Sequence, residues 1–437
     1  MLNPSNTSAI KKPTAHRLFS GSWSARLTVA SLLVPAYAPA APVLTEVAGT
    51  LQVCRLGPDT AVARATRLRG AAHVAAADVL PNPSLVLQHQ RTMSGWVDRE
   101  TIAGVSIPFG VSGRHGLLKD AAAARREEAE ADADATLFES ALAFRETYLT
   151  ALVDQARTVI LNEQQLALEA SSATMEALAK SGEAAGYDLL RQRVQTRLHR
   201  GSVESAKAHA LASRARLEAW IETEVELPDI DLAVLAHGSG AQPPTEVPSS
   251  RRVESLRAAS RASALDARAA RRRWVPDPEV FAGYRALDQN AGIAHGVSLG
   301  LTLPLTFFDH GQGEAALADA ERERLQTSAE RLSQQQRAEA KAARVRLQQL
   351  TSNLEDLGQA RDGASELLAQ AQRLYSAGEA SITEMLEAFR AAEDARLAEL
   401  ERAFEIALTR LDVMRASGSM FDPSLDQACT RSEPRKP

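Results

Sequence analysis

The sequence predicts a mainly α-helical protein with a small β part, built from two copies of one large unit. Two short tips at a fixed spacing indicate the duplication. Gly182-Glu183-Ala184 opens one tip, and Gly378-Glu379-Ala380 opens the other 196 residues later. In both, three variable residues lead to an acid, an apolar residue and a leucine. A glycine that ends one helix just before another begins is typical of a tight helix-turn-helix tip.

Two further landmarks repeat at the same spacing. Pro81-Asn82-Pro83 is echoed by Pro276-Asp277-Pro278 after 195 residues, and Gly104 to Phe109 is echoed by Gly300 to Leu305 after 196. Three landmarks in one order, with spacings that agree to one residue, indicate an internal repeat. We therefore expect each copy to hold one pair of strands and one long helical hairpin.

Composition favours long helices over a compact enzyme core. Only 4% of the 437 residues are aromatic, and alanine, arginine, glutamate and leucine dominate much of the chain. The net charge of −5 gives no sign of a nucleic-acid partner. Arg271-Arg272-Arg273 is interpreted as a solvated helix end rather than a phosphate-binding patch. Cys54 and Cys429 have no zinc-site spacing, and whether they pair is left open.

The first 41 residues, 1–41, are interpreted as an export signal peptide. Lys11, Lys12 and Arg17 precede a short apolar run from Leu27 to Val34, and small residues follow around Ala38. The apolar run is too short to span a bilayer as a helix. We expect the mature chain to begin near Ala38 to Ala41 without a lipid anchor on Cys54. A disordered tail is the alternative.

The first repeat is expected over residues 58–226. Asp59 to Val79 is predicted to be a helix that ends before Pro81. Its strands, 84–90 and 101–109, lie within 84–109, and a helical hairpin spans 114–224, with its tip between helices 117–178 and 187–224. Residues 227–250 hold four prolines, so they are interpreted as an irregular linker.

The second repeat is expected over residues 251–417. A helix over 251–274 precedes strands 279–287 and 296–307, which lie within 279–307. The second hairpin spans 312–416, with helices 314–376 and 383–416 on either side of its tip. The remaining residues, 418–437, are expected to form a disordered tail.

The last predicted strand has one apolar face and one small polar face. Val297, Leu299, Leu301, Leu303 and Leu305 alternate with Ser298, Gly300, Thr302, Pro304 and Thr306. This pattern suits a strand with lipid on one side and a wet interior on the other. A half-buried strand of a soluble sheet gives the same alternation. Four strands are too few to close a barrel, so a membrane interpretation requires several chains.

The predicted helices are far longer than a compact domain needs. A helix of about 62 residues at about 1.5 Å per residue is about 93 Å long. Apolar residues before and after the second tip recur in alternating steps of three and four, as in coiled-coil seams, and Arg361 is the one break. A soluble coiled-coil rod explains the seams but not the strand pairs. The seam residues are Leu347, Leu350, Leu354, Leu357, Ala364, Leu368, Ala371, Tyr375, Leu397, Leu400, Phe404, Ala407, Leu411 and Met414.

With these features the chain resembles the TolC family of outer-membrane efflux ducts over about residues 58–416. The family pattern is a duplicated strand pair and helical hairpin with a Gly-x5-Asp-Leu-Leu-like tip in each copy. Within the family the chain is most similar to the heavy-metal (CzcC-like) efflux branch. That similarity is carried by these motifs: Pro81-Asn82-Pro83, Ser106-Ile107-Pro108-Phe109, Gly113-Arg114, Pro276-Asp277-Pro278, Gly283-Tyr284, Leu303-Pro304-Leu305, Phe308-Asp309 and Gly311-Gln312-Gly313.

The resemblance implies a homotrimer in the outer membrane of a Gram-negative cell. Three chains would close a twelve-stranded β-barrel in lipid, and the hairpins would form an α-helical tunnel through the periplasm. A periplasmic adaptor protein and an inner-membrane RND-type pump would be the partners. The cargo is left open: metal cations are favoured through the branch, and multidrug efflux or type I secretion by the same fold is the alternative.

The resemblance also implies a periplasmic gate and adaptor-contact site at the tips. Counting from Gly378, Glu384 is at plus six and Glu387 at plus nine. Asp188 and Arg191 hold the same places after Gly182. Threefold symmetry would turn the two glutamates into acidic rings, with Arg191 as the nearest candidate for their counter-charge. Stabilisation of helix-start acids by the helix dipole is the alternative explanation.

The sequence shows no catalytic constellation, metal site or cofactor motif, so we expect a passive conduit and not an enzyme. His115 and His310 fall in strand-to-helix turns, and Asp309-His310 is interpreted as a cap or a solvated pair rather than a metal site. A soluble coiled-coil scaffold remains the rival from another class. Unlike a membrane duct, it would stay in the aqueous fraction.

Overall fold

The computed structural model describes residues 43–92, 99–181, 185–237, 250–289, 292–420 and 422–430. The chain divides into the units Met1–Ala40 and Ala41–Pro437, and all described residues belong to the second. The predicted signal peptide, residues 1–41, therefore lies outside the described residues. So does Gly182 of the first tip.

The predicted fold class is confirmed: long helical hairpins are combined with one small antiparallel sheet. The two copies match element by element, since α2 and α6 have 21 residues each and α4 and α8 have 36 each. The long helices α3 and α7 have 68 and 65 residues. The first copy is α2 (Pro58–Asp78), β1 (Ser84–Arg91), β2 (Arg99–Pro108), α3 (Arg114–Ser181) and α4 (Gly186–Ile221). The second is α6 (Arg251–Arg271) with a 3-10 turn η1 (Arg272–Trp274), β3 (Glu279–Gln289), β4 (Gly292–Thr302), α7 (Gln312–Ser376) and α8 (Ile382–Ser417).

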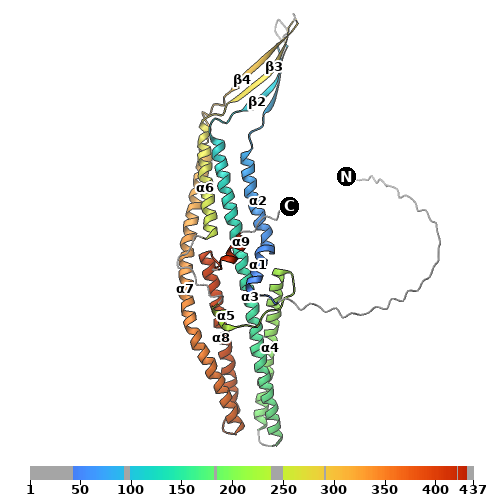
Figure 1. Ribbon diagram of the computed structural model, residues 1–437, viewed down its shortest axis with the longest axis vertical. Helices are drawn as coiled ribbons and strands as arrows, with labels where there is room; N and C mark the ends of the chain where they lie inside the picture. The colour runs from blue at the N-terminus through green and yellow to red at the C-terminus, as the bar shows by residue number, and fades with distance from the viewer. Residues whose placement is uncertain are drawn as a thin grey trace, which may run out of the picture. The chain divides into compact units, whose positions relative to one another are not determined.

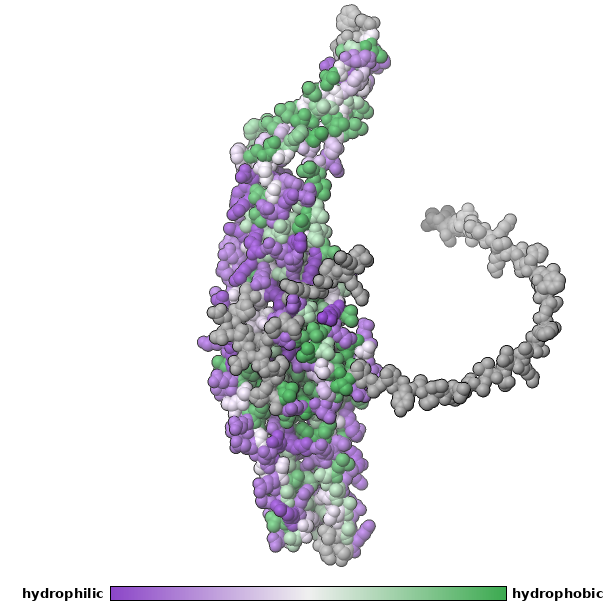
Figure 2. Space-filling model, in the orientation of Figure 1, coloured by the Kyte–Doolittle hydropathy of each residue, from purple (hydrophilic) through white to green (hydrophobic). Residues whose placement is uncertain are grey.

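The four strands form one sheet in the order β1-β2-β3-β4, with every neighbouring pair antiparallel. Paired residues lie on the same face of a sheet and successive residues on opposite faces. One face, here called the apolar face, carries Leu85, Leu87, Val105, Ile107, Val280, Val297, Leu299 and Leu301, all of them exposed. Figure 2 shows hydrophobic residues covering much of the sheet where it meets the helices, whereas hydrophilic residues dominate the helical surface.

The opposite face of the sheet, here called the polar face, holds small and hydrophilic residues. Arg285 of β3 pairs with Glu100 of β2, the Nε and Oε1 atoms being 2.7 Å apart. Gly104 and Gly283 face each other across β2 and β3, and the ring of Phe281 lies where a Cβ atom on either would be. The alternation expected for a strand between lipid and a wet interior is therefore present in the half of the sheet nearest the helices. In the other half, His89, Arg99 and Asp288 lie on the same face as the apolar residues. The polar face also carries Gln88, Gln90, Gly296, Ser298 and Gly300, together with the apolar Val86, Ile102 and Leu287.

The last strand is shorter than expected. β4 ends at Thr302, although the sequence pattern predicted a strand to residue 307. Thr302 pairs with Glu279, the first residue of β3, so residues beyond Thr302 have no partner on that strand. Pro304, which has no N–H to donate, then follows. Leu303, Leu305 and Phe307 continue as exposed apolar residues without strand pairing.

The helices pack around α3. It contacts α2, α4, α6 and α8, whereas α7 contacts mainly α6 and α8. Figure 1 shows α2 and α4 following one another along α3, and α6 and α8 following one another along α7. The sheet lies at one end of these helices and both tips lie at the other (Figure 1). At about 1.5 Å per residue, α3 alone is about 100 Å long.

The break in the predicted seam has a partner. Arg361 of α7 donates from Nη1 to both carboxylate oxygens of Glu399 of α8, each at 2.9 Å. Glu399 is buried, and Leu350 and Leu400 pack in the core of the same helix pair. The charged residue in the seam therefore neutralises a buried acid on the facing helix, a pairing that the heptad pattern of one helix cannot show.

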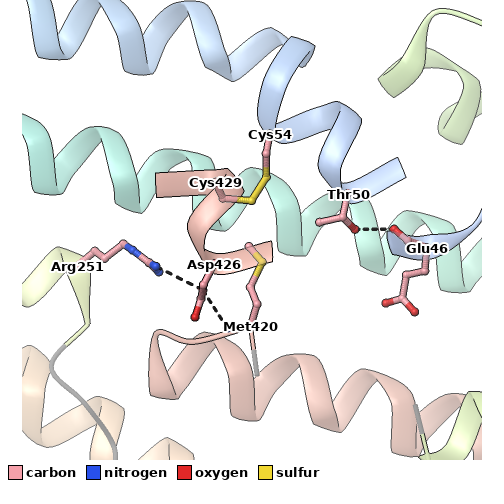
Figure 3. The surroundings of a disulfide bond; sticks show 7 residues. All are labelled: Glu46, Thr50, Cys54, Arg251, Met420, Asp426 and Cys429. Atoms are coloured by element: carbon pink, nitrogen blue, oxygen red, sulfur yellow. Dashed lines mark hydrogen bonds and ion pairs between the residues drawn. A yellow bond between two sulfur atoms is a disulfide. The ribbon is translucent and has the colours of Figure 1, made fainter. Parts of the chain in front are cut away.

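A belt of short helices surrounds the middle of the bundle: α1 (Glu46–Leu56), α5 (Leu232–His237) and α9 (Pro423–Thr430). A disulfide joins Cys54 of α1 to Cys429 of α9 (Figure 3). Asp426 of α9 accepts hydrogen bonds from Met420 N and Ser419 Oγ and pairs with Arg251 at 3.4 Å. The expectation of disorder over 418–437 is therefore wrong for α9, because the helix is fixed by contacts to residues far away in the sequence. The linker 227–250 likewise contains α5.

Candidate gate at the helical tips

The two tips lie together and share a small apolar core. Leu168 and Met175 of α3 pack with Met385, Leu386 and Phe389 of α8. The side chains Leu189, Leu368, Tyr375 and Ile382 complete this cluster. All four hairpin helices therefore contribute to one packed end, opposite the sheet (Figure 1). A displacement of one hairpin must disturb the core that it shares with the other.

Gly378 ends α7 in the way that its position predicted. Its φ angle is +77°, in the left-handed region that favours glycine. Its N–H donates to Tyr375 O at 3.0 Å, and the next N–H, of Glu379, donates to Leu374 O at 2.9 Å. This pair of bonds is the Schellman motif, which satisfies carbonyls left free at a helix C-terminus.

Glu384 belongs to the N-terminal cap of α8. The Ser381 N–H donates to Glu384 Oε2 at 2.7 Å, and Ser381 Oγ accepts from Glu384 N at 3.3 Å, which together form a capping box. The hydrogen bond from the Ser381 backbone, followed by that from its hydroxyl, lowers the pKa of the exposed Glu384 carboxyl. Within one chain this acid therefore satisfies its own helix start.

Arg191 contacts the second tip, but through a hydroxyl. Its Nη1 donates to Thr383 Oγ1 at 2.6 Å. No ion pair joins Arg191 to Glu384 or Glu387 in the described part of this chain, which differs from the expected counter-charge. The hydrogen bond nevertheless connects the first turn of α4 to the first turn of α8. Glu387, one turn further along α8, is exposed.

Asp188 lies beside the end of the other hairpin. It is half-buried, and its charge raises the pKa of the Tyr375 phenol, after the larger effect of burial. Asp188 and Arg191, which are three residues apart on α4, therefore both face residues of the second tip. The structure brings Asp188, Arg191, Gly378, Glu384 and Glu387 to one end of the molecule.

Two buried amides near the tips were not identified from the sequence. Gln164 Nε2 donates to Phe389 O at 2.8 Å, linking α3 to α8, and Gln192 Nε2 donates to Leu168 O at 3.2 Å, linking α4 to α3. Both side chains are buried. In the sequence they are ordinary polar residues of a helix. The one signal that could have identified them is helical periodicity, which places them on the same face as apolar residues.

Asp309 stabilises the strand-to-helix turn with its side chain, whereas the N-cap position of α7 is Gly311. Asp309 Oδ1 accepts from Gly311 N at 3.0 Å, and Oδ2 lies 3.5 Å from Arg273 Nη1. Among the residues that the structure describes, no three His, Cys, Asp or Glu side chains are grouped so as to hold a metal ion. Over the same ranges, no helix is both long enough and apolar enough to cross a membrane.

Comparison with known proteins gives the fold a name. Residues 248–419 match the family model "Outer membrane efflux protein". CusC superposes with a TM-score of 0.71 at 15% identity, over 86% of this chain and 92% of that one. The outer-membrane channel OprN gives 0.71 at 18%, over 86% and 91%. VceC from Vibrio cholerae gives 0.67 at 15%, over 86% and 96%.

No curated protein sequence matches the chain. The structural similarity extends over both copies of the repeat, whereas the family match covers the second copy, from just before α6 to the end of α8. The fold of this chain is thus that of the outer-membrane efflux channels, and its second repeat matches their family.

Proposed function

We propose that the chain forms the outer-membrane duct of a tripartite efflux system, as a homotrimer that acts as a passive conduit. The observation that carries this proposal is the sheet: an exposed apolar face, with a polar face behind it, stands at the end of helices about 100 Å long. A soluble coiled-coil scaffold has no use for such a face, which would favour aggregation in water.

Three copies of the sheet would complete a barrel. β1 and β4 are the outer strands of the sheet, and each is paired on one side within the chain. Pairing β4 of one copy with β1 of the next joins twelve strands and leaves no free edge, the arrangement that lipid requires. Exposed aromatic residues at the junction between sheet and helices fit the interfacial girdle of such barrels: Phe109, Trp274, Phe307 and Phe308.

The helices carry matching evidence for a trimer. Leu190, Val194 and Leu198 are four residues apart on α4, so they form one stripe, and all three are exposed. Leu367 and Leu374 are exposed on α7. A neighbouring copy that covers these residues would extend the bundle into a closed tunnel. In the proposed cell, the tunnel lies in the periplasm of a Gram-negative bacterium.

The tips would be the gate and the contact for a periplasmic adaptor, which in turn joins an inner-membrane RND-type pump. Gly182 is proposed to have the same role in the first tip as Gly378 has in the second, and threefold symmetry would multiply Glu384 and Glu387 into acidic rings. Cations are attracted by such rings. Metal cations are the favoured cargo through the motifs of the heavy-metal branch, with multidrug or type I secretion ducts as the alternative.

Membrane fractionation tests the duct itself. We expect the protein in the outer-membrane fraction and, after extraction in detergent, a trimer by native mass spectrometry. The variant pair Val194→Glu and Leu198→Glu should abolish the trimer, while Val194→Ile and Leu198→Met should retain it. Recovery of a wild-type monomer from the aqueous fraction would favour the scaffold instead.

Reconstituted channels test the gate. Replacing Glu384 and Glu387 together by Ala should lower cation selectivity, because the acidic rings are lost. Arg191→Ala should raise conductance, because it removes the bond to Thr383 that joins the two hairpins. Unchanged selectivity and conductance would leave these side chains with the capping and packing roles already described.

A further inference from the structure

A buried polar cluster joins three helices above the tips. His199 of α4 lies with Nδ1 at 3.0 Å from Oε1 of Gln165, on α3, and with Nε2 at 3.1 Å from Oε2 of Glu393, on α8. The His199 side chain is 4% exposed and that of Glu393 is 18% exposed. Glu393 is eleven residues beyond Ile382, where α8 begins, so the cluster stands about 17 Å along that helix.

The hydrogen bonds of Gln165 fix which nitrogen of His199 carries a proton. Gln165 Nε2 donates to Glu169 Oε1 at 2.7 Å, and a carboxylate can only accept. The other end of the amide, Oε1, therefore faces His199 Nδ1 and must receive a proton from it. In a neutral imidazole that donates from Nδ1, the Nε2 atom has a lone pair and no hydrogen.

This places the unprotonated Nε2 atom, on the other edge of the ring, against the Glu393 carboxylate. The Nε2 atom is fully buried and has no aligned hydrogen-bond partner among the described residues, while the Glu393 carboxylate is 3.1 Å away. A lone pair facing a carboxylate in a buried site is unfavourable. One proton, carried by Nε2 or by Oε2, turns the same contact into an attraction.

We infer that His199 and Glu393 bind one proton between them, and that this proton holds the first hairpin to the last helix. Because Nε2 and Oε2 face one another at 3.1 Å, this proton belongs to the contact rather than to either side chain. When the proton leaves, α4 and α8 lose the attraction between these two side chains, and the buried lone pair and carboxylate repel one another.

No neighbouring cation takes over the role of this proton by forming an ion pair with Glu393 among the described residues. Glu169, which orients Gln165, is paired with Arg200 at 2.7 Å on the exposed side of α4. On α8, Arg390 lowers the pKa of Glu393 and Asp394 raises it. The other contact of Arg390 is Gln195 Oε1, at 2.6 Å. On α3, Glu163 pairs with Arg396 at 2.7 Å. No described lysine or arginine forms an ion pair with Glu393.

Burial is the largest influence on Glu393 and raises the pKa of its carboxyl, and the charge of His199 partly opposes that effect. A raised pKa in the folded protein means that the folded state binds the proton more tightly than the unfolded chain. The stabilisation is therefore complete below the ordinary glutamate pKa and is lost as the pH rises through the raised pKa of Glu393 in the folded protein. Contact between the hairpins should weaken in the same direction.

This inference deepens the proposed function in one respect: if the tips are a gate, proton loss from this cluster loosens the gate. The proton link itself does not depend on transport. It can be measured on the full chain in detergent, without a membrane potential, an adaptor or a pump.

Hydrogen exchange of the helices around positions 199 and 393 tests the link between about pH 5 and about pH 9, a range that begins just above the ordinary glutamate pKa and includes the ordinary histidine pKa. After correction for the intrinsic effect of pH, exchange in the wild-type chain should become about tenfold faster across this range. In Glu393→Gln the amide can donate to an unprotonated Nε2 or accept from a protonated one, so the contact stays attractive in both states and this rise should disappear.

His199→Gln keeps the Glu393 carboxyl but places opposite it an amide that can donate to the ionised form or accept from the protonated form. The contact then stays attractive in both states, so this variant should also flatten the response. Arg396→Gln breaks an exposed ion pair between α8 and α3, two of the three helices that the cluster joins, and serves as the matched control. It should change the level of exchange but keep the pH-dependent rise.

A rise that persists in both Glu393→Gln and His199→Gln, or a wild-type chain without one, would overturn the inference. The duct proposal is judged separately by trimer formation and membrane fractionation. A trimer without the rise rejects only the proton link, and a rise in a protein that does not form trimers rejects only the duct.

Discussion

The two long helices occupy corresponding places in the repeat but very different surroundings. α3 buries large side chains along its middle, among them Phe144 and Leu142, which are fully buried. On α7 the buried residues are mostly alanines, and Leu317, Val345 and Leu367 are more than half exposed. α3 is enclosed by α2, α4, α6, α8 and the belt helices α1 and α9, whereas α7 packs mainly on α6 and α8.

The difference shows that a duplicated sequence plan does not produce duplicated environments. The belt helices α1 and α9 pack on α3 and on each other, and they have no described counterparts along α7. α7 therefore keeps an uncovered face in a single chain, as the sheet keeps two outer strands. On the proposed function, both are covered by neighbouring copies.

The largest expected effect contrasts a buried residue of α3 with an exposed one of α7. Phe144→Ala should lower the free energy of unfolding by about 3–5 kcal/mol, because Phe144 is fully buried and lies edge-on to Trp220. Leu367→Ala should change it by less than about 1 kcal/mol in the monomer. Chemical denaturation of the detergent-solubilised protein measures both, and equal losses would refute the contrast.

Removal of the disulfide should cause the next largest loss in the free energy of unfolding. Cys54→Ser with Cys429→Ser should lower the free energy of unfolding by about 2–4 kcal/mol, because the bond restricts an unfolded chain over a separation of 375 residues. Hydrogen exchange should rise in α1 and α9, while the tips stay unchanged. Reduction of the wild-type protein provides the control, and uniform loosening of the whole bundle would contradict a local role for the belt.

The two glycines at the ends of α7, Gly311 before it and Gly378 after it, should differ in how much a substitution destabilises the fold. Gly378→Ala should cost about 1–2 kcal/mol, since φ is +77° but a Cβ atom meets nothing within 4 Å. Gly311→Ala should cost more, because φ is +86° and the new Cβ would collide with the carbonyl oxygen of Ala270. Thermal unfolding of the two variants decides the order, and a larger loss for Gly378→Ala would contradict it.

The smallest expected effect is the weakening of the N-terminal cap of α8 at low pH. Hydrogen bonds from Ser381 lower the pKa of Glu384, so the cap of α8 is stabilised above the ordinary glutamate pKa and weakened as the pH falls through the lowered value. Amide exchange in residues 381–386 should therefore accelerate in acid beyond its intrinsic rate. Glu384→Gln should lose this acid response, and a response that remains would place its origin elsewhere.

Much of the fold could be predicted from local sequence. The repeated landmarks, the alternating strands and the glycine tip at Gly378 follow from backbone preferences and side-chain periodicity within a few residues. The fold class and the opposite faces of the sheet were therefore accessible from the sequence, and Gly378 adopts the left-handed cap that its position indicated. At the tips, the sequence placed Glu384 at a helix start, where the helix dipole stabilises an acid, but its capping box with Ser381 is a finding of the structure.

Tertiary structure decided which distant groups meet. The pairing of Cys54 with Cys429, the match of Arg361 to Glu399, the donation from Arg191 to Thr383 and the cluster of His199 with Glu393 all join separate helices. The end of β4 was set by where β3 begins. Periodicity specifies which face of a helix is apolar, but it does not specify the rotation and axial position of the facing helix. Those are fixed when the whole bundle packs, and they determine the partner of each polar side chain.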